Sequence, residues 1–454
     1  MMRATDPALA RRSIKALAQL MKRPLPATAD GAPLLLTLDQ GACLAIVDDL
    51  VVVASDDAAL DHLQERLHGR DPSLLSNPGF ATARARSSEG RVAFLWLNSA
   101  ALDALTPAPG LVPEGSQNPI GQLLAGRLLC ALNHSSMVSA ELCLSGRELR
   151  VDVELPCDLE ARSPLKPVYR EAPHSSAPLV PDTLLSISAR RDYRAWWDLR
   201  DAVLDERLKP GLVEFETNMG VLFSGKSVGD VLAGLDGDTH FVLTRQEFGE
   251  HGPTVRYPAG ALVLKVADAK ALWPHLLIAF QTAIGFANAD RGQKGLAQLL
   301  IENGAYRDCP IVTTRYVDDM TVGRAAGNAP EHANVRPACA MANGELILAS
   351  SVDLARQVVD AIVDDRRLPR TEMLDTVTLQ ARSLVKILAE NEAALVANSM
   401  LEKGLSKVAA KQQLDVLLQV VRLFESAGIT TREQNGALTV SARLRWNPLE
   451  VAAR

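Results

Sequence analysis

The sequence predicts an α+β fold in which antiparallel sheets are built from hairpins and amphipathic helices pack mainly on one face. Three observations lead to this prediction: a hairpin followed by a helix occurs twice, a second kind of hairpin also occurs twice, and the strands alternate apolar and polar residues. Alternation with period two directs apolar side chains to one face, and short turns join antiparallel neighbours.

The first repeated unit is a tight hairpin. Ala45–Ser55 and Ala340–Ser350, 295 residues apart, each read as a strand, a two-residue turn and a second strand ending in Ala-Ser. The turns are Asp48-Asp49 and Asn343-Gly344, of which Asn-Gly is the stronger hairpin signal.

A helix is expected directly after each of these hairpins. Ser55 and Ser351 can cap the two helices, because a serine hydroxyl accepts from the first unpaired backbone N–H groups. The apolar residues recur at helical spacing in both copies, at Leu60, Leu63 and Leu67 and at Leu354, Val358 and Ile362.

The second repeated unit closes each copy. Leu142–Leu155 and Thr431–Leu444 read as hairpins that turn at Gly146 and Gly436, and their second strands alternate cleanly. At the other end of the chain, Ser13–Met21 resembles Gln293–Ile301, since both contain Leu-Ala-Gln-Leu. We therefore interpret residues 10–22 as a structural helix with a partner in the second copy, not as a targeting segment.

These matches predict two related modules of unequal length. Residues 1–156 form an incomplete first copy, 157–181 a proline-rich linker or extended strap, and 182–454 a complete second copy. Within the second copy, 182–335 is the front half and 336–454 the back half that matches 42–156.

The second copy is expected to supply the remaining elements. The front half contains strands at 182–188, 239–244 and 260–266, with helices from Tyr193 and over 271–284. A long helical stretch, Thr376–Ala427, covers the sheet of the back half.

The imbalance between the copies bears on location. A first copy that lacks its front half leaves a sheet edge uncovered, which favours an N-terminal portion missing from this chain over truncation in evolution. A signal peptide can precede such a portion. The location is therefore bacterial envelope or secreted if the N-terminus is incomplete, and otherwise cytoplasmic.

Composition narrows the class of protein. The 454 residues are 47% hydrophobic, and their net charge of −6 comes from acidic and basic residues mixed along the chain, which argues against a nucleic-acid surface. No stretch approaches the roughly 20 apolar residues of a membrane helix. The six cysteines show no CxxC and no metal-ligand spacing with histidine, which favours free thiols over disulfides.

Three segments of the second copy carry a family resemblance. Asp192–Trp197, Gly220–Gly225 and Gly234–His240, together with the strand-hairpin-helix units, resemble a bacterial, mostly exported family, the domain of unknown function numbered 3352. The resemblance covers most of 180–454 and, more faintly, 30–156. It implies a sheet-plus-helices fold and an envelope or secreted location, and it brings no catalytic residues.

The sharpest motif is a P-loop-like match. Gly220, Gly225, Lys226 and Ser227 fit G-x-x-x-x-G-K-[ST], in which backbone N–H groups and the lysine hold phosphates and the hydroxyl binds Mg²⁺. The bulky residues between the glycines and the hairpin-based fold argue against a nucleotide site. The alternative is a short strand, a turn at Ser224–Lys226 and a helix from Val228.

Two further segments have a functional and a structural interpretation. Asp236, Asp238 and His240 lie at alternate positions, where they could bind a metal, but a carboxylate-rich turn entering a strand is the favoured interpretation. Trp196 and Trp197 could line a cleft; we expect Trp196 to pack inward and Trp197 to cover an edge.

The sequence thus favours a non-catalytic binding or scaffold protein, with no catalytic residue, metal or cofactor assigned. A carrier that holds an apolar ligand such as a lipid between sheet and helices is the alternative, and a nucleotide-binding enzyme using Gly220–Ser227 is a third. The partner would be a protein or a lipid.

Overall fold

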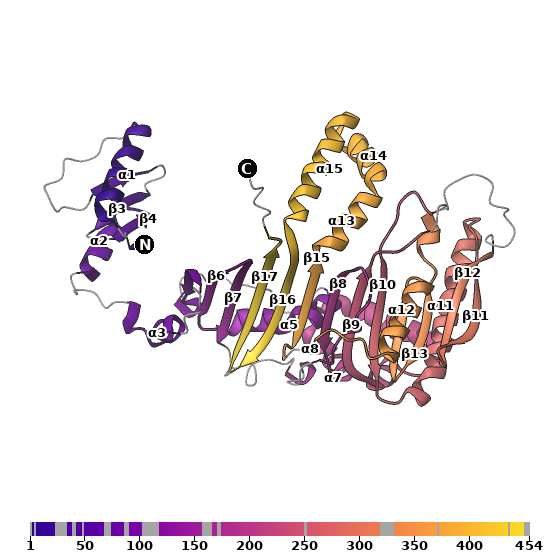
Figure 1. Cartoon of the computed structure of the whole chain (residues 1–454). Coiled ribbons are helices and arrows are strands. Elements are labelled where there is room, and N and C mark those ends of the chain that lie inside the picture. Colours follow the sequence, from indigo (N-terminus) through magenta and orange to yellow (C-terminus); the bar gives the residue numbers. More distant parts are fainter. Residues whose placement is uncertain are drawn as a thin grey trace. The chain divides into compact units, whose positions relative to one another are not determined.

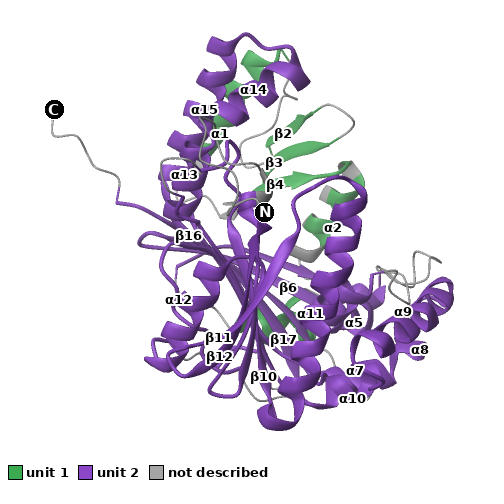
Figure 2. Cartoon of the chain, turned by 90° about the vertical axis from the view of Figure 1, so that its right-hand side faces the viewer, with its two compact units in different colours: residues 1–87 green, residues 88–454 purple. Residues whose placement is uncertain are grey.

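The computed structural model divides into two compact units, residues 1–87 and 88–454 (Figures 1 and 2). It describes residues 2–3, 6–22, 34–38, 42–47, 50–67, 74–85, 90–101, 118–156, 166–169, 174–248, 252–317, 331–369, 372–434 and 436–448. The sequence predicts a boundary within 157–181, whereas the boundary between the units falls between residues 87 and 88, so the strands of 90–156 belong to the same unit as those of 182–454.

Unit 1 is a small antiparallel sheet with helices. Its strands lie in the order β1-β4-β3-β2. Ile14 and Ala18 of α1 pack on Leu34, Leu36 and Ile46 of the sheet. The elements are β1 (Met2–Arg3), α1 (Pro7–Leu20), β2 (Leu34–Thr37), β3 (Cys43–Val47), β4 (Leu50–Ala54), α2 (Asp57–Leu67) and α3 (Pro78–Ala85).

Unit 2 contains one thirteen-stranded sheet in which every pairing is antiparallel, in the order β11-β12-β13-β14-β10-β9-β8-β15-β16-β17-β7-β6-β5. This confirms the predicted α+β class. The strands are β5 (Arg91–Leu97), β6 (Val138–Ser145), β7 (Glu148–Pro156), β8 (Thr183–Arg190), β9 (Leu235–Thr244), β10 (Ala259–Val266), β11 (Leu299–Tyr306), β12 (Cys309–Tyr316), β13 (Ala338–Ala342), β14 (Glu345–Ala349), β15 (Asp375–Gln380), β16 (Phe424–Gln434) and β17 (Ala437–Trp446).

The connections between these strands contain the helices of unit 2. They are α5 (Pro119–His134), α7 (Tyr193–Asp198), α8 (Arg200–Val203), α9 (Lys209–Leu222), α10 (Val228–Ala233), α11 (Ala269–Gln293), α12 (Val352–Val363), α13 (Ala381–Glu390), α14 (Glu392–Lys403) and α15 (Lys407–Arg422). The last three project from the ends of β15 and β16 as a helical arm (Figure 1). No described helix combines the length and apolar character needed to cross a membrane.

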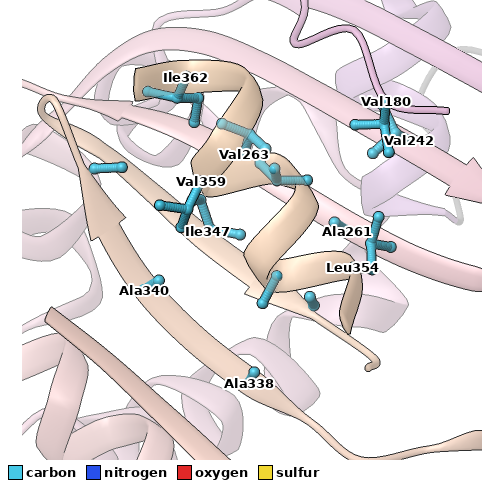
Figure 3. Close-up of a cluster of buried hydrophobic side chains, with 14 of the residues drawn as sticks. Val180, Val242, Ala261, Val263, Ala338, Ala340, Ile347, Leu354, Val359 and Ile362 are labelled. Atoms are coloured by element: carbon cyan, nitrogen blue, oxygen red, sulfur yellow. The ribbon is translucent and has the colours of Figure 1, made fainter. Parts of the chain in front are cut away.

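The largest core cluster lies under α12. Ser351 caps this helix by accepting from Leu354 N–H, as predicted, and the buried stripe that includes Leu354, Val358 and Ile362 faces the sheet. Small residues on β13, Ala338 and Ala340, let the helix approach closely (Figure 3).

The two faces of the sheet are both covered here. Ala340 and Ile347 point toward α12 (Figure 3), while their neighbours Cys339 and Leu346 belong to a second cluster with α11. The α12 and α11 helices therefore pack on opposite faces, in three layers.

Both predicted hairpins form. Asn343 and Gly344 have φ values of 47° and 76°, the left-handed pair that a type I′ turn requires. In unit 1, β3 and β4 pair in the same register, Cys43 with Ala54 as Ala338 with Ala349. The turn residues 48–49 lie outside the described residues. Asp56, not Ser55, accepts from the N–H of the first helical turn.

The second hairpins, β6–β7 and β16–β17, lie side by side in the sheet. Their central strands β7 and β17 pair so that Ser441 is opposite Asp152, to which its hydroxyl donates at 2.6 Å. Ser441 follows Asp152 by 289 residues, the spacing that also relates Leu438 to Leu149 and Leu444 to Leu155. Leu438 in turn pairs with Leu155, and Leu444 with Leu149, so the pairing has the pattern of a local two-fold axis.

The start of the chain has a different counterpart from the one predicted. Gln293–Ile301 is not a helix: α11 ends at Gln293 and β11 begins at Leu299. Instead β1 and α1 correspond in order to β10 and α11. β1 pairs with β4 as β10 pairs with β14, and Asp6 and Asp268 each accept from the N–H three residues on.

The predicted long helix over Thr376–Ala427 is also wrong at both ends. Residues 375–380 form β15, and β16 begins at Phe424. β15 is central in the sheet, paired with β8 and β16, so its β-branched run Thr376-Val377-Thr378 is placed by partners distant in sequence.

Candidate functional site

The strongest concentration of buried polar groups lies on one face of β8, β9 and β15. His174–Val180, which we call the strap, lies over this face and contains no helix. The buried polar side chains are Ser186 and Ser188 of β8, Asp238 and His240 of β9, and His174 of the strap.

His240 is the centre of this cluster. Its Nδ1 lies 2.9 Å from Ser188 Oγ and its Nε2 lies 3.1 Å from Ser175 Oγ. Only 2% of the residue is exposed. Burial, together with the charges of His174 and Arg367, lowers the pKa of His240 to about 3, so the imidazole is neutral at physiological pH.

His174 lies against it from the strap. Its Nδ1 is 2.7 Å from the carbonyl oxygen of Ser175, which only accepts, so in the neutral ring Nδ1 carries the proton. Nε2 then accepts from the Thr376 hydroxyl at 3.2 Å. The two imidazole rings meet edge to face at a centroid distance of 6.0 Å.

The predicted metal ligands lie within β9 and not in a turn before it. Asp238 and His240 both contact the strap, whereas Gly237, with a φ of 93°, interrupts the regular strand between Asp236 and Asp238. Asp238 accepts from the backbone N–H of Ser175 and from Arg190, both at 3.2 Å. Asp236 lies 3.7 Å from Arg190. No cluster able to hold a metal ion occurs among the described residues.

Ser175 and His240 are residue types that can form a nucleophile and its general base, but their surroundings do not support this role. A hydroxyl, from Ser188, lies where a triad has a carboxylate to stabilise the imidazolium. A base with a pKa near 3 takes up few protons at neutral pH. The imidazole is also inaccessible to a substrate, so the cluster attaches the strap to the sheet.

Further contacts hold the rest of the strap. Arg367 donates to the carbonyl of Ser176 and forms a two-pronged ion pair with buried Glu345 at 2.8 and 3.2 Å. Leu179 N–H donates to Arg366, and Leu368 N–H donates to Ala177. Sequence reasoning singled out Asp238 and His240 but missed their partners, because these come from segments far apart in the chain.

A second buried polar centre surrounds Arg191, which is 2% exposed. Its guanidinium donates to the carbonyls of Leu123 and Leu124 in α5 and pairs with Asp375 at 2.6 Å. The Tyr169 ring lies 4.4 Å from it. Arg191 therefore attaches α5 to β8 and β15.

The P-loop-like residues occupy a helix-turn-helix connection. Gly220 lies in α9, and Ser224 and Gly225 form the turn with φ values of 55° and 84°. Ser227 caps α10, accepting from Asp230 N–H and donating to its carboxylate. A P-loop follows a strand, so the short strand expected before this turn is replaced by a helix, and the hydroxyl already has a partner.

The tryptophan pair is oriented oppositely to the prediction. Trp197 is buried, with 4% exposed, and Trp196 is only partly buried. Trp197 packs between Arg200, 4.5 Å from its ring, and Phe215 of α9. Both indoles thus pack within the helical cover of unit 2.

The largest apolar exposure with a regular pattern lies on α15. Ala410, Leu414 and Leu418 are buried against the other helices of the arm. The opposite side carries Val416, Val420 and Leu423, which are 59%, 45% and 50% exposed. The sequence alone indicates this exposure. Apolar residues at 410, 414 and 418 already form the one face that packs on the other helices, so the apolar residues on the remaining faces have no helix to pack against.

Comparisons with protein-family models and with curated proteins find no match to this chain.

Proposed function

We propose that this chain is a non-catalytic binding or scaffold protein that contacts its partner through the outer face of α15. The buried polar groups described above are all engaged in holding elements together, whereas α15 presents aliphatic side chains to solvent. Contiguous exposed apolar surface on a soluble domain is typical of an interaction site.

The geometry of the helix supports this. At about 100° per residue, Val416, Val420 and Leu423 fall within an arc of about 60°. Gln412, Gln413 and Gln419 lie in or beside this arc, while Lys411, Asp415 and Arg422 lie together on another side. The outer face is therefore uncharged, and it suits an apolar partner surface such as an amphipathic helix.

The experiment is site-specific photo-crosslinking in cells that produce the full chain. A photoreactive amino acid at Val416 or Val420 is expected to give a discrete crosslinked product. The matched control is Asp415, which is also exposed but lies on the charged side of the same helix. Equal crosslinking at all three positions, or none at Val416 and Val420, would contradict the proposal.

We also propose that the two parts of the chain are copies of one ancestral unit. Support comes from the order β1-α1-β2-β3-β4-α2-β5-β6-β7, which matches β10-α11-β12-β13-β14-α12-β15-β16-β17 once α3 and α5 of the first part and β11, α13, α14 and α15 of the second are set aside. The equal hairpin registers and the symmetric pairing of β7 with β17 add to it. The resemblance to the exported family numbered 3352 supports a location in the bacterial envelope.

A further inference from the structure

β5 is one of the two edge strands of the large sheet, and it is the less protected of the two. After Arg91 it consists of six apolar residues, Val92–Leu97, and Val92 and Leu95 are each 63% exposed. The opposite edge strand, β11, contains Glu302, Asn303 and Gly304, and Glu302 pairs with Arg315. Charged and glycine residues discourage pairing at an edge, and neither kind occurs among the six residues that follow Arg91 in β5.

The proposed duplication, on which this inference rests, tells which strand is absent beside β5. β5 pairs with β6 as β15 pairs with β16: Leu95 is opposite Ala140, and Val377 is opposite Ile429, 289 residues after Ala140. By the same register Leu97 corresponds to Leu379. β5 thus takes the place of β15 in the first copy.

In the second copy β15 is not an edge. Its other side pairs antiparallel with β8, which sets Ile187 opposite Val377 and Leu185 opposite Leu379. Among the described residues of unit 2, no strand lies beside the corresponding side of β5.

We propose that the outer edge of β5 binds an extended segment of a partner protein as an added antiparallel strand. Main-chain hydrogen bonds supply the affinity in such β-augmentation, and alternate side chains supply the specificity. The partner segment carries apolar residues, in the pattern of Leu185 and Ile187, opposite Leu97 and Leu95.

The partner segment proposed for β5 differs from β8 in the charge needed at one end. In the second copy Asp375 pairs with Arg191, the residue directly after β8. Ala93 occupies the position of Asp375 in β5. The site on β5 therefore requires no arginine at that end.

The test uses the full chain and a fluorescent peptide with the sequence of residues 181–191, which contains β8. Saturable binding measured by fluorescence anisotropy is expected. Leu95→Lys should weaken it by about tenfold or more, because the lysine charge would be desolvated beside the new strand. Leu300→Lys on β11 is the matched control, since Leu300 is also a leucine of an edge strand.

Two peptides with methylated backbone nitrogens provide a second test. Because the protein itself is unchanged, the result does not depend on whether a variant folds. Methyl groups on alternate amides block one edge of the peptide, so one of the two methylation patterns should abolish binding and the other should leave it intact. Equal effects of both patterns, or equal weakening by Leu300→Lys, would overturn the proposal.

A second copy of the chain is the competing occupant. Light scattering without peptide tests this alternative. If the wild type dimerises and Leu95→Lys abolishes the dimer, the strand that binds β5 is the β5 of a second copy. That result would overturn the proposal of a separate partner protein. Crosslinking from Val416 does not depend on β5, so failure of this proposal and failure of the proposed function are separate results.

Discussion

At the scale of single residues, the strap depends on side chains that must remain uncharged. His240 accepts or donates only to hydroxyl groups, and its neighbours His174 and Arg367 oppose a further positive charge. Asp238, the nearest carboxylate in its strand, is already engaged with Arg190. Protonation of His240 would leave a charge without a partner in the core.

The folded protein should therefore lose stability as the pH falls from about 6.5 toward 3. The unfolded chain protonates His240 near its ordinary pKa of 6.5, whereas folding lowers this pKa to about 3. Between these values the unfolded state binds more protons, with a slope of up to about 1.4 kcal/mol per pH unit.

Urea unfolding at several pH values measures this slope. His240→Gln should flatten this slope relative to that of the wild type. A slope unchanged by His240→Gln would show that other groups cause the pH dependence.

At the scale of elements, the hairpins could be predicted because their signals are local. Asn343-Gly344 specifies its turn, whereas the alternation along 438–444 is not matched by burial, since Leu438 is buried and Ala442 is exposed. β15 could not be predicted in this way, since its pairing with β8 joins residues almost 200 positions apart. The segment Gly220–Ser227 shows the opposite case. Its residues match the P-loop pattern, but the segment begins within the helix α9 and does not follow a strand.

The turn at Gly344 gives a prediction for this scale. Gly344→Ala should destabilise the protein by about 1–2 kcal/mol, because alanine resists the left-handed φ of 76°. Space is not the cause, since the nearest atom to an added Cβ is Val266 O at 3.8 Å. Gly211→Ala, in α9 with open surroundings, should instead stabilise by about 0.5–1 kcal/mol.

Chemical denaturation of both variants measures the difference. A Gly344→Ala variant as stable as the wild type would show that the hairpin tolerates another turn type.

At the scale of the molecule, the two units should respond separately to changes in their cores. Leu36 in unit 1 and Leu155 in unit 2 are both fully buried. Each substitution with alanine should cost about 2–5 kcal/mol in its own unit.

Hydrogen exchange followed by mass spectrometry locates the effect. Leu36→Ala should speed exchange within residues 6–67 and leave 118–156 unchanged, and Leu155→Ala should do the opposite. Faster exchange across both units from either substitution would mean that they unfold as one cooperative body.

In the candidate site, as in the fold, features set by neighbouring residues could be predicted from the sequence, and contacts between distant segments could not. Alternation correctly placed Asp238 and His240 on one face, but their partners come from the strap and β8. Such contacts need the three-dimensional arrangement, because nothing in the neighbouring sequence marks His174 or Ser175 as their partners.

The pairing of Ser441 with Asp152 has a consequence for how the large sheet arose. In the proposed duplication it lies on the axis of what would be an isologous interface between two identical subunits, because Leu438–Leu155 and Leu149–Leu444 are the same contact made twice. Fusion into one polypeptide makes such an association intramolecular, so it no longer depends on protein concentration. Each half could then diverge, which a homodimer cannot do.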